Sequence, residues 1–498
     1  MLASRSARSW WLVVSTGIVA ALLATQAPAQ SLPVDCDGPA GDPNPATDPN
    51  RYRPRDLVNM LCSLQRIQDE YTNPAFFLKF EVYETPGTYS RNVLDQLQEP
   101  TRPRVTLAQW IPGGTTADPY RVPQDWEAAG RGRVEEISFI AADGAKLVGR
   151  IFTPNPTDPP SKLPAVVITT GSIQGYQELY NWASEGLAEA GYMVLAYDVQ
   201  GQGRSETFPH AADGSIACDA SGCTGVPFQQ SYNFTQGTRD ALDFLLSTPD
   251  DPYAHAVGTN AAGTNSYNPL HGELDTAKLG VAGHSLGASA VSVVGQSYPG
   301  VSAIVAWDAL APIAKDSGGN LVDDLGNPVT LHVPALSVTA EYFLNPTPAD
   351  PSNPPDPANK SAAFEQLSTA RIDTMLVQLR SSTHLEFSYV PYILPASRFG
   401  ERVSMYYTLA WFDRYLKGDL TASDRLKALT FDGSADASSI GGGTFDPTQI
   451  QPGVVGADGN VPYRIEGNCV ANRLSFYYHS KYFLGEETEN DMRGRGCP

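Results

Sequence analysis

Short apolar runs alternate with longer amphipathic stretches between residues 134 and 416. The short runs are rich in β-branched residues and are bounded by turn residues, which is typical of β-strands. The run at 165–169 has an unbroken apolar character, as expected of a strand buried on both faces. The pattern predicts eight strands, at 134–140, 146–152, 165–169, 193–197, 279–282, 303–307, 335–339 and 375–379.

The longer stretches carry apolar residues every three or four positions, which predicts amphipathic helices. In the first of them, Leu179, Trp182, Ala183 and Leu187 fall on one helical face. Further helices are expected at 235–246, 286–296, 362–372 and 398–416. The alternation predicts an α/β fold, in which helices cover both faces of an eight-stranded, mostly parallel sheet.

The segments on either side of this alternation have a different character. Residues 30–130 are rich in Pro, Asp and Asn, with one convincing helical stretch at 56–71, and we interpret them as an irregular N-terminal extension. Residues 421–498 contain one β-like run at 474–483 and are expected to form a small C-terminal appendage. The α/β domain itself is expected at 131–420.

Three insertions interrupt the α/β pattern, near 207–233, 249–273 and 316–330. The last of them is expected to form a hairpin around Leu325-Gly326-Asn327-Pro328. No internal repeat is evident. Insertions on the loops of an α/β sheet usually shape the substrate site, so these three segments are expected to matter for specificity.

Composition and charge narrow the range of partners. The chain has 498 residues, of which 42% are hydrophobic and 18% charged, so it is too apolar to be mainly disordered. Its 34 Lys and Arg against 54 Asp and Glu give a formal net charge of −20. Such a chain has no broad basic surface for phosphates, which argues against nucleic acid and anionic membranes as partners.

The first 29 residues read as a secretory signal peptide. Arg5 and Arg8 precede an apolar stretch at 10–24, and Ala27-Pro28-Ala29 supplies the small-x-small cleavage pattern. A transmembrane anchor is the alternative, but the apolar stretch is short of the roughly 20 residues that span a bilayer. We therefore expect a mature, unanchored chain that begins at Gln30 and is extracellular or periplasmic.

Export would place the cysteines in an oxidising compartment, where their even number predicts disulfides. Proximity along the chain favours the pairs Cys36–Cys62, Cys218–Cys223 and Cys469–Cys497, with the middle pair best supported. A zinc site is the alternative. It is disfavoured because no second cysteine pair or histidine pair stands at ligand spacing.

Residues 283–287 carry the first chemical signal, Gly-His-Ser-Leu-Gly. They fit Gly-x-Ser-x-Gly, a sharp strand-to-helix turn that projects a serine hydroxyl from a sheet, with glycines where side chains would collide. The motif follows the strand predicted at 279–282 and opens the helix predicted at 286–296, the context that the motif requires. This predicts Ser285 as a nucleophile, with an ordinary glycine-rich turn as the alternative.

With this motif the chain resembles the α/β-hydrolase superfamily over residues 133–418. Three further segments look like family landmarks, namely Ala142-Asp143-Gly144, residues 198–205 and residues 410–416. The resemblance is to secreted serine esterases and lipases, including dienelactone-hydrolase-like and polyester-hydrolase-like enzymes. Gly201 and Gly203 also begin a dinucleotide-binding pattern, but Glu206 stands where its third glycine belongs, so a turn is the better interpretation.

A serine needs a base to take its proton, and in this family the base follows the acid, which follows the serine. His384 comes after the strand at 375–379 and a polar turn, where the family carries its base. His332 precedes the expected acid and so has the wrong order. His479 lies within the run at 474–483, where a packed or exposed strand residue is the simpler interpretation.

The acid must orient the imidazole from a neighbouring strand end. Thr339-Ala340-Glu341 resembles the Gly-Ala-Asp of secreted polyester hydrolases, which makes Glu341 the expected acid. Asp308, which closes the strand at 303–307, is the rival because some relatives place the acid after the sixth strand. The loop residues Asp350 and Asp356 remain as further alternatives.

Acyl transfer also needs backbone N–H groups that stabilise the developing oxyanion. The family resemblance implies Leu286, directly after the nucleophile, as one donor. The second is expected from the loop at 169–175, which aligns with the family's His-Gly-x loop but has Thr170 in place of the histidine. Ser172 is the expected donor there, with Ile173 one register away. No cofactor is required, and no twelve-residue calcium loop is visible.

Taken together, these features predict a secreted serine hydrolase that cleaves small-molecule or polymeric carboxylic esters through an acyl-enzyme on Ser285. The alternative is a secreted serine peptidase of the prolyl-oligopeptidase or acyl-peptidase type, but residues 30–130 are too few and too irregular for a propeller. A binding module that has kept the fold would usually lack one member of the triad. The oligomeric state does not follow from the sequence.

Overall fold

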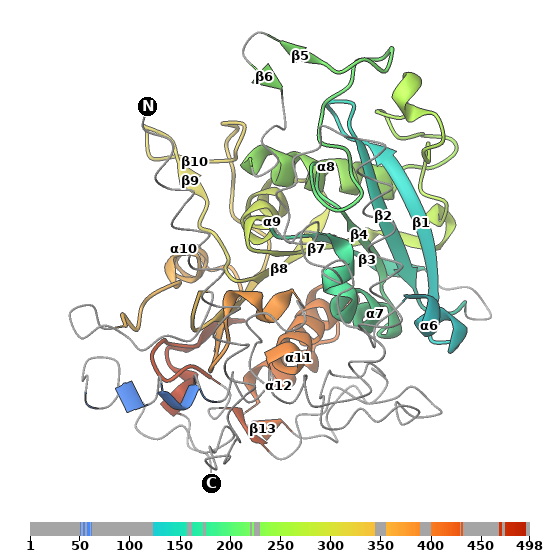
Figure 1. The fold of residues 1–498 in the computed structure, drawn as a ribbon. Coiled ribbons are helices and arrows are strands. Elements are labelled where there is room, and N and C mark those ends of the chain that lie inside the picture. The colour runs from blue at the N-terminus through green and yellow to red at the C-terminus, as the bar shows by residue number, and fades with distance from the viewer. Residues whose placement is uncertain are drawn as a thin grey trace, which may run out of the picture. The chain divides into compact units, whose positions relative to one another are not determined.

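In the computed structural model, the backbone is described for residues 50, 53–54, 57–59, 61, 123–156, 162–172, 176–219, 222–223, 230–343, 355–388, 400–428, 430–431, 468–470 and 474–494. These residues form an α/β protein around a ten-stranded, mixed and largely parallel sheet (Figure 1). The strand order is β1-β2-β4-β3-β7-β8-β11-β12-β15-β16.

The eight predicted strands are all present. They are β1 (Arg133–Ile140), β2 (Lys146–Thr153), β3 (Leu163–Thr169), β4 (Met193–Tyr197), β7 (Leu274–His284), β8 (Val301–Trp307), β11 (Ala335–Ala340) and β12 (Thr374–Leu379). The strands from β4 to β12 in the sheet order pair in parallel, whereas β2 is antiparallel to both of its neighbours. All seven residues of β3 are buried, as its unbroken apolar run predicts.

The sheet has two strands more than the sequence pattern predicts. β15 (Lys481–Leu484) pairs antiparallel with β12, and β16 (Glu487–Glu489) pairs antiparallel with β15. β15 overlaps the β-like run expected at 474–483, whereas β16 is too short to stand out as a periodic run. Both come from the C-terminal residues that the pattern sets apart from the α/β domain. Part of that segment therefore completes the main sheet at one edge.

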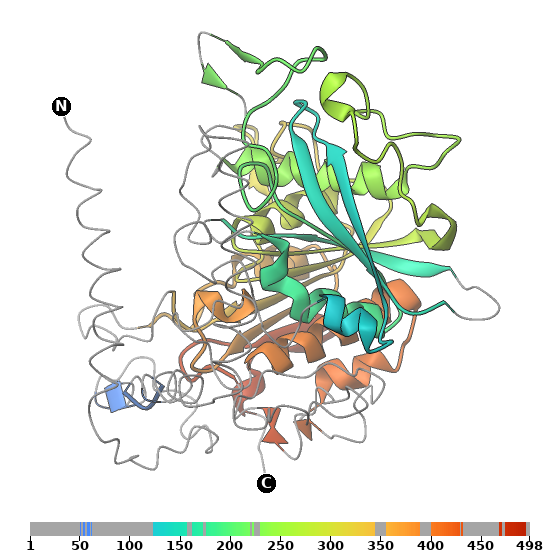
Figure 2. The same ribbon diagram turned by 45° about the vertical axis from the view of Figure 1, so that its right-hand side comes forward.

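Helices cover both faces of the sheet. The main ones are α7 (Asn181–Glu189), α8 (Ser231–Leu246), α9 (Leu286–Ser297), α10 (Ala362–Thr369) and α11 (Gly400–Phe412). Successive side chains of β3 point to opposite faces of the sheet and so belong to two hydrophobic clusters. Val166 and Ile168 pack with α7 and α11 on one face. Ala165 and Val167 pack with α8 and α9 on the other. In Figure 2 the teal strands β1 and β2 run across the central strands, as the twist of a wide sheet requires.

The insertion at 316–330 forms two successive turns. In the first, β9 (Ala314–Lys315) pairs with β10 (Leu321–Val322). The carboxylates of Asp316 and Asp323 each accept N–H bonds from the residues two and four positions later. Both turns share the order Asp-x-x-Gly-Asn, and the glycine has a φ of 84° in one and 81° in the other. The expected hairpin is therefore a short internal repeat, which the periodicity of the sequence did not indicate.

A disulfide joins Cys218 to Cys223 in the first insertion and so confirms the predicted middle pairing. The two cysteines lie on facing residues of the short strands β5 (Cys218–Asp219) and β6 (Gly222–Cys223). The other two predicted pairs involve residues outside the described part of the chain. The predicted signal peptide and most of the helix expected at 56–71 also lie outside it. Among the residues with described backbone, no helix has the length and apolarity needed to cross a membrane.

Candidate active site at the ends of the parallel strands

Ser285 lies on the sharp turn between β7 and α9. Its φ of 57° and ψ of −119° are far from the conformations that a serine prefers. The Ser285 N–H donates to the Trp307 carbonyl oxygen at 3.1 Å, and the Ser285 carbonyl accepts from the Ser289 N–H at 3.1 Å. The neighbouring strand β8 and the first turn of α9 therefore hold the strained serine in place, as the sequence motif predicts.

The two glycines of the motif are required by close packing. A Cβ atom added at Gly283 would lie 2.4 Å from the Gly287 carbonyl oxygen, and one added at Gly287 would lie 2.2 Å from the Thr169 carbonyl oxygen. No side chain fits at either position. The start of α9 can therefore approach the end of β3, and this approach sets the angle at which Ser285 leaves the sheet.

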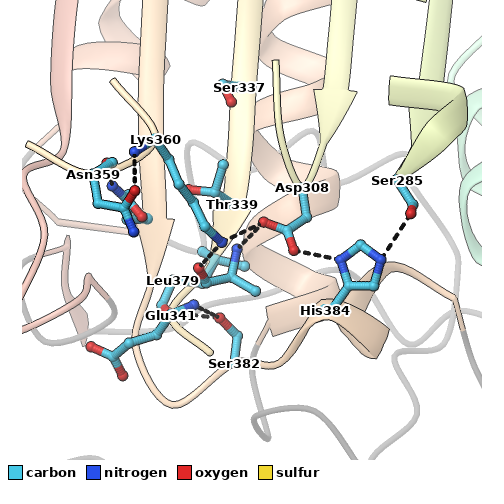
Figure 3. A network of polar contacts seen from close by, with 12 residues as sticks. Ser285, Asp308, Ser337, Thr339, Glu341, Asn359, Lys360, Leu379, Ser382 and His384 are labelled. Atoms are coloured by element: carbon cyan, nitrogen blue, oxygen red, sulfur yellow. Dashed lines mark hydrogen bonds and ion pairs between the residues drawn. The ribbon is translucent and has the colours of Figure 1, made fainter. Parts of the chain in front are cut away.

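His384 links Ser285 to an acid through both of its ring nitrogens. Its Nε2 lies 2.9 Å from Ser285 Oγ, and its Nδ1 lies 2.6 Å from Asp308 Oδ2 (Figure 3). The three residues follow β7, β12 and β8, so they meet at the carboxyl edge of the parallel strands. Because Nδ1–H donates to a carboxylate, Nε2 is free to accept the serine proton. This arrangement can activate Ser285 as a nucleophile.

The structure brings Asp308, and not the expected Glu341, to the imidazole. Glu341 follows β11, and Figure 3 shows its carboxylate pointing away from His384. Asp308 has a φ of 44°, and its Oδ1 accepts from the Ala340 N–H at 3.2 Å while Oδ2 bonds His384. Chain order could not separate the two acids, because both lie between the serine and the histidine and both end a parallel strand.

Lys360 contacts the carboxylate of Asp308 on the side away from His384. Its Nζ lies 2.7 Å from Asp308 Oδ1 and 2.7 Å from the Ala340 carbonyl oxygen. Burial alone would raise the pKa of Asp308, but the nearby Lys360 and His384 outweigh it and hold that pKa well below its ordinary value. Asp308 is therefore ionised at neutral pH. A lysine in an irregular segment before a helix gives no sequence signal for this contact.

His284, the second residue of the motif, supports the backbone of His384. Its Nε2 lies 2.9 Å from the His384 carbonyl oxygen, and its Nδ1 lies 2.9 Å from Tyr180 Oη, which accepts from the Gly171 N–H. Burial, followed by the effect of His384, lowers the pKa of His284 to about 3. His284 is therefore neutral, with its proton on Nε2. This role could not be predicted because the motif leaves its second position open.

Of the two expected oxyanion donors, Leu286 directly follows Ser285, and Ser172 lies in a loop whose Gly171 approaches Ser285. Leu286 is the first residue of α9, where backbone N–H groups have no partner within the helix. The loop after β3 also approaches closely, since a Cβ added at Gly171 would lie 3.2 Å from Ser285 Cβ. Ser172 follows directly in this loop, and its alternative Ile173 lies outside the described residues. The local packing is thus consistent with both donors.

The remaining candidates lie elsewhere. His332 is exposed and bonds the Thr330 carbonyl oxygen, whereas His479 pairs with Asp491 at 3.1 Å. Asp356 is exposed, and Asp350 is outside the described residues. A Cβ added at Gly203 would lie 2.3 Å from Asp198 Oδ2, which agrees with a tight turn. No group of three or more potential metal-binding side chains occurs in the described part of the chain.

Phe343 is the exposed aromatic residue beside this arrangement. Its ring centroid lies 5.0 Å from that of His384, and the side chain is 66% exposed. Its carbonyl oxygen accepts from the His384 N–H at 2.6 Å, so its backbone is held against the histidine. By contrast, Tyr180 and Trp307 are fully buried in the core beneath the site. Phe343 thus offers an apolar surface next to the reactive atoms.

No protein-family model matches the chain, and a search of curated proteins found no similar sequence. The functional conclusion therefore depends on the geometry of the site.

Proposed function

We propose that this protein is a serine hydrolase of the α/β-hydrolase fold, which cleaves carboxylic esters through an acyl-enzyme on Ser285. The observation that carries the proposal is the hydrogen-bonded chain from Ser285 Oγ through His384 to Asp308, built on a strained strand-to-helix turn. The fold assignment is supported by the strand order β1-β2-β4-β3-β7-β8-β11-β12, with the serine after β7.

Acylation begins when Ser285 Oγ attacks the ester carbonyl carbon and His384 Nε2 takes the hydroxyl proton. Asp308 keeps the imidazole oriented and stabilises its positive charge. The oxygen of the tetrahedral intermediate becomes an anion, for which the N–H groups of Leu286 and Ser172 are the proposed donors. When the intermediate collapses, the imidazolium gives its proton to the departing alkoxide, and an alcohol leaves.

Deacylation repeats these steps with water. His384 Nε2 takes a proton from the water as its oxygen attacks the acyl carbon, and the same proton then returns to Ser285 Oγ as the carboxylic acid is released. All proton transfers use residues of this chain. The exposed Phe343 ring gives an apolar acyl or alcohol group a surface to cover, which favours ester substrates with such a group.

Secretion is part of the proposal. The signal-like N-terminus and the Cys218–Cys223 disulfide support an extracellular or periplasmic location. The mature chain from Gln30 should therefore be produced under oxidising conditions.

The test follows hydrolysis of p-nitrophenyl acetate, butyrate and palmitate and of an aminoacyl-anilide. Ser285→Ala should lower ester turnover at least about a thousandfold, because the nucleophile is lost. Ser289→Ala, at an exposed position one turn later in α9, is the matched control and should keep the activity. Ester turnover that survives Ser285→Ala unchanged refutes the proposal, and cleavage of the anilide alone identifies a peptidase.

A further inference from the structure

Glu341 lies at the centre of a buried polar cluster that joins separate parts of the chain. Its Oε2 accepts from Asn59 Nδ2 at 3.0 Å and from the Ser381 N–H at 2.8 Å. Its Oε1 accepts from Ser475 Oγ at 2.6 Å and from the Phe476 N–H at 3.2 Å. The side chain is 4% exposed, so these donors replace the water that a carboxylate normally binds. The position of the carboxylate is thus defined from several directions.

Asn59 brings the N-terminal extension into this cluster. It is fully buried, and its Oδ1 accepts from Ser381 Oγ at 2.6 Å. Its Nδ2 donates to Tyr342 Oη at 2.8 Å as well as to Glu341. Asn59 therefore contacts both Glu341 and the turn that precedes His384.

The cluster is connected to the turn that precedes His384. The Glu341 N–H donates to Ser382 Oγ at 3.1 Å (Figure 3). The Tyr342 N–H donates to the Ser382 carbonyl oxygen at 3.0 Å. Ser381 has a φ of 60°, which is unfavourable for a serine and persists only if neighbours hold it. The bond from its N–H to Glu341 Oε2 provides such a restraint.

We propose that Glu341 is a positioning residue, whose carboxylate, together with Asn59, holds the turn at 381–383 so that the His384 ring stays in reach of both Ser285 and Asp308. The inference rests on the proposed hydrolase function. It also assigns a role to the N-terminal extension, which supplies Asn59 to the support of the site. Small displacements of a general base matter, because a shift of about 1 Å can lower a rate about a hundredfold.

Matched variants can separate this role from general stability. Glu341→Gln and Asn59→Ala are compared with Glu206→Gln and Asn260→Ala. Glu206 Oε2 accepts from the Lys146 N–H at 2.7 Å and from Asn260 Nδ2 at 2.9 Å, which reproduces the backbone and amide donors of Glu341 Oε2. In the described part of the chain, Glu206 and Asn260 contact Lys146, Gly144, Gly201, His210 and each other, away from residues 381–384. Each variant is assayed for kcat and KM with p-nitrophenyl butyrate, for phosphonylation of Ser285 by a small fluorophosphonate, and for Tm.

Glu341→Gln directs an amide N–H2 at one pair of donors and should lower kcat at least about tenfold, with KM changed less than about threefold. Phosphonylation should slow in proportion. Asn59→Ala should lower kcat in the same way but by a smaller factor. Because both side chains hold one turn, the loss of kcat in the double variant, expressed as a free energy, should not exceed the sum of the two single losses. The Glu206 and Asn260 variants should keep kcat.

The outcomes distinguish this inference from the function on which it rests. A folded wild-type protein that neither hydrolyses the esters nor reacts with the probe refutes the hydrolase proposal. An active wild type whose folded Glu341→Gln and Asn59→Ala variants keep its kcat overturns the positioning role alone, even if their Tm falls. If Glu341→Gln does not fold, Asn59→Ala decides: a selective loss of kcat supports the role, and an unchanged kcat overturns it.

Discussion

Lys360 and His384 bind opposite oxygens of the same carboxylate, that of Asp308. Lys360 Nζ lies 2.7 Å from Oδ1, and His384 Nδ1 lies 2.6 Å from Oδ2. Lys360 has a φ of 62°, a conformation that is uncommon for a lysine. The cation keeps Asp308 ionised, yet it also opposes the second positive charge that forms on the imidazole during the proposed reaction.

Replacing Lys360 with methionine should move the acid limb of the pH profile of kcat/KM upward, by up to about one pH unit. The His384 ring contacts Asp308 Oδ2 and Ser285 Oγ, and Lys360 acts on it through the other oxygen of the Asp308 carboxylate. Without the lysine cation, the carboxylate stabilises the protonated imidazole more strongly, so the free base that accepts the Ser285 proton appears only at higher pH. The measurement is kcat/KM for p-nitrophenyl butyrate between pH 5 and pH 9.

Lys278→Met is the control for the loss of a lysine, because Lys278 pairs with Asp275 at 3.3 Å near the start of β7. Its profile should coincide with that of the wild type. An acid limb that stays in place or moves downward in Lys360→Met would contradict the influence of Lys360 on the histidine.

Asp308→Asn should lower kcat about a thousandfold to ten-thousandfold, because an amide favours the wrong tautomer of His384 and cannot stabilise its positive charge. The loss should exceed that of Glu341→Gln, since Asp308 bonds the ring itself. Asp356→Asn, at an exposed position, should have no effect. Near-normal turnover in Asp308→Asn would remove this residue from the proposed mechanism.

Much of this architecture could be predicted because it depends on local patterns. Strands such as β3 and β4 are continuous apolar runs, and the elbow at Ser285 follows from glycines that admit no side chain. The pairing of Ser285 with His384 also agrees with the order of motifs along the chain. β16 was missed because three residues are too few to show a period, whereas β15 overlaps the β-like run expected at 474–483, for which the pattern gave no place in the main sheet.

The acid and its surroundings depend on long-range packing, which periodicity does not encode. Asp308 and Glu341 end adjacent parallel strands, and only the direction of the backbone after each strand decides which carboxylate reaches His384. Lys360 comes from an irregular segment and Asn59 from a helical stretch of the N-terminal extension, and they are 52 and 282 positions from the acids they contact. Neither contact leaves a recognisable spacing in the sequence.

His284→Gln should make the stability of the protein less sensitive to acid. The pKa of His284 is about 3 in the folded protein against an ordinary value of 6.5, so between these values the unfolded chain binds one proton more than the folded chain. Stability from this group is therefore present above pH 6.5 and is lost as pH falls toward 3. The free energy of unfolding falls through this group by at most about 1.4 kcal/mol per pH unit. Glutamine does not titrate, so it abolishes this pH dependence while keeping an N–H donor for the His384 carbonyl.

The measurement is the free energy of unfolding in urea at pH 7, 6, 5 and 4.5. Other buried groups, such as Asp198 and Asp240, whose pKa values are raised to about 7 by burial, titrate in both proteins, so only the difference in slope is compared. Parallel curves for the wild type and His284→Gln would show that His284 does not gain a proton on unfolding.

Phe343→Ala tests whether the exposed ring beside His384 binds the apolar part of an ester. An acetyl group is too small to cover the ring, whereas a butyryl or palmitoyl chain can bury part of its surface at about 25 cal/mol per Å². We therefore expect kcat/KM to fall several-fold for the butyrate and palmitate esters and little for the acetate. Leu325→Ala removes another exposed apolar side chain, in the turn at 323–327, and should leave all three values unchanged. An equal loss for the three esters would instead indicate that Phe343 acts through the position of His384, whose N–H bonds its carbonyl oxygen, and not through contact with substrate.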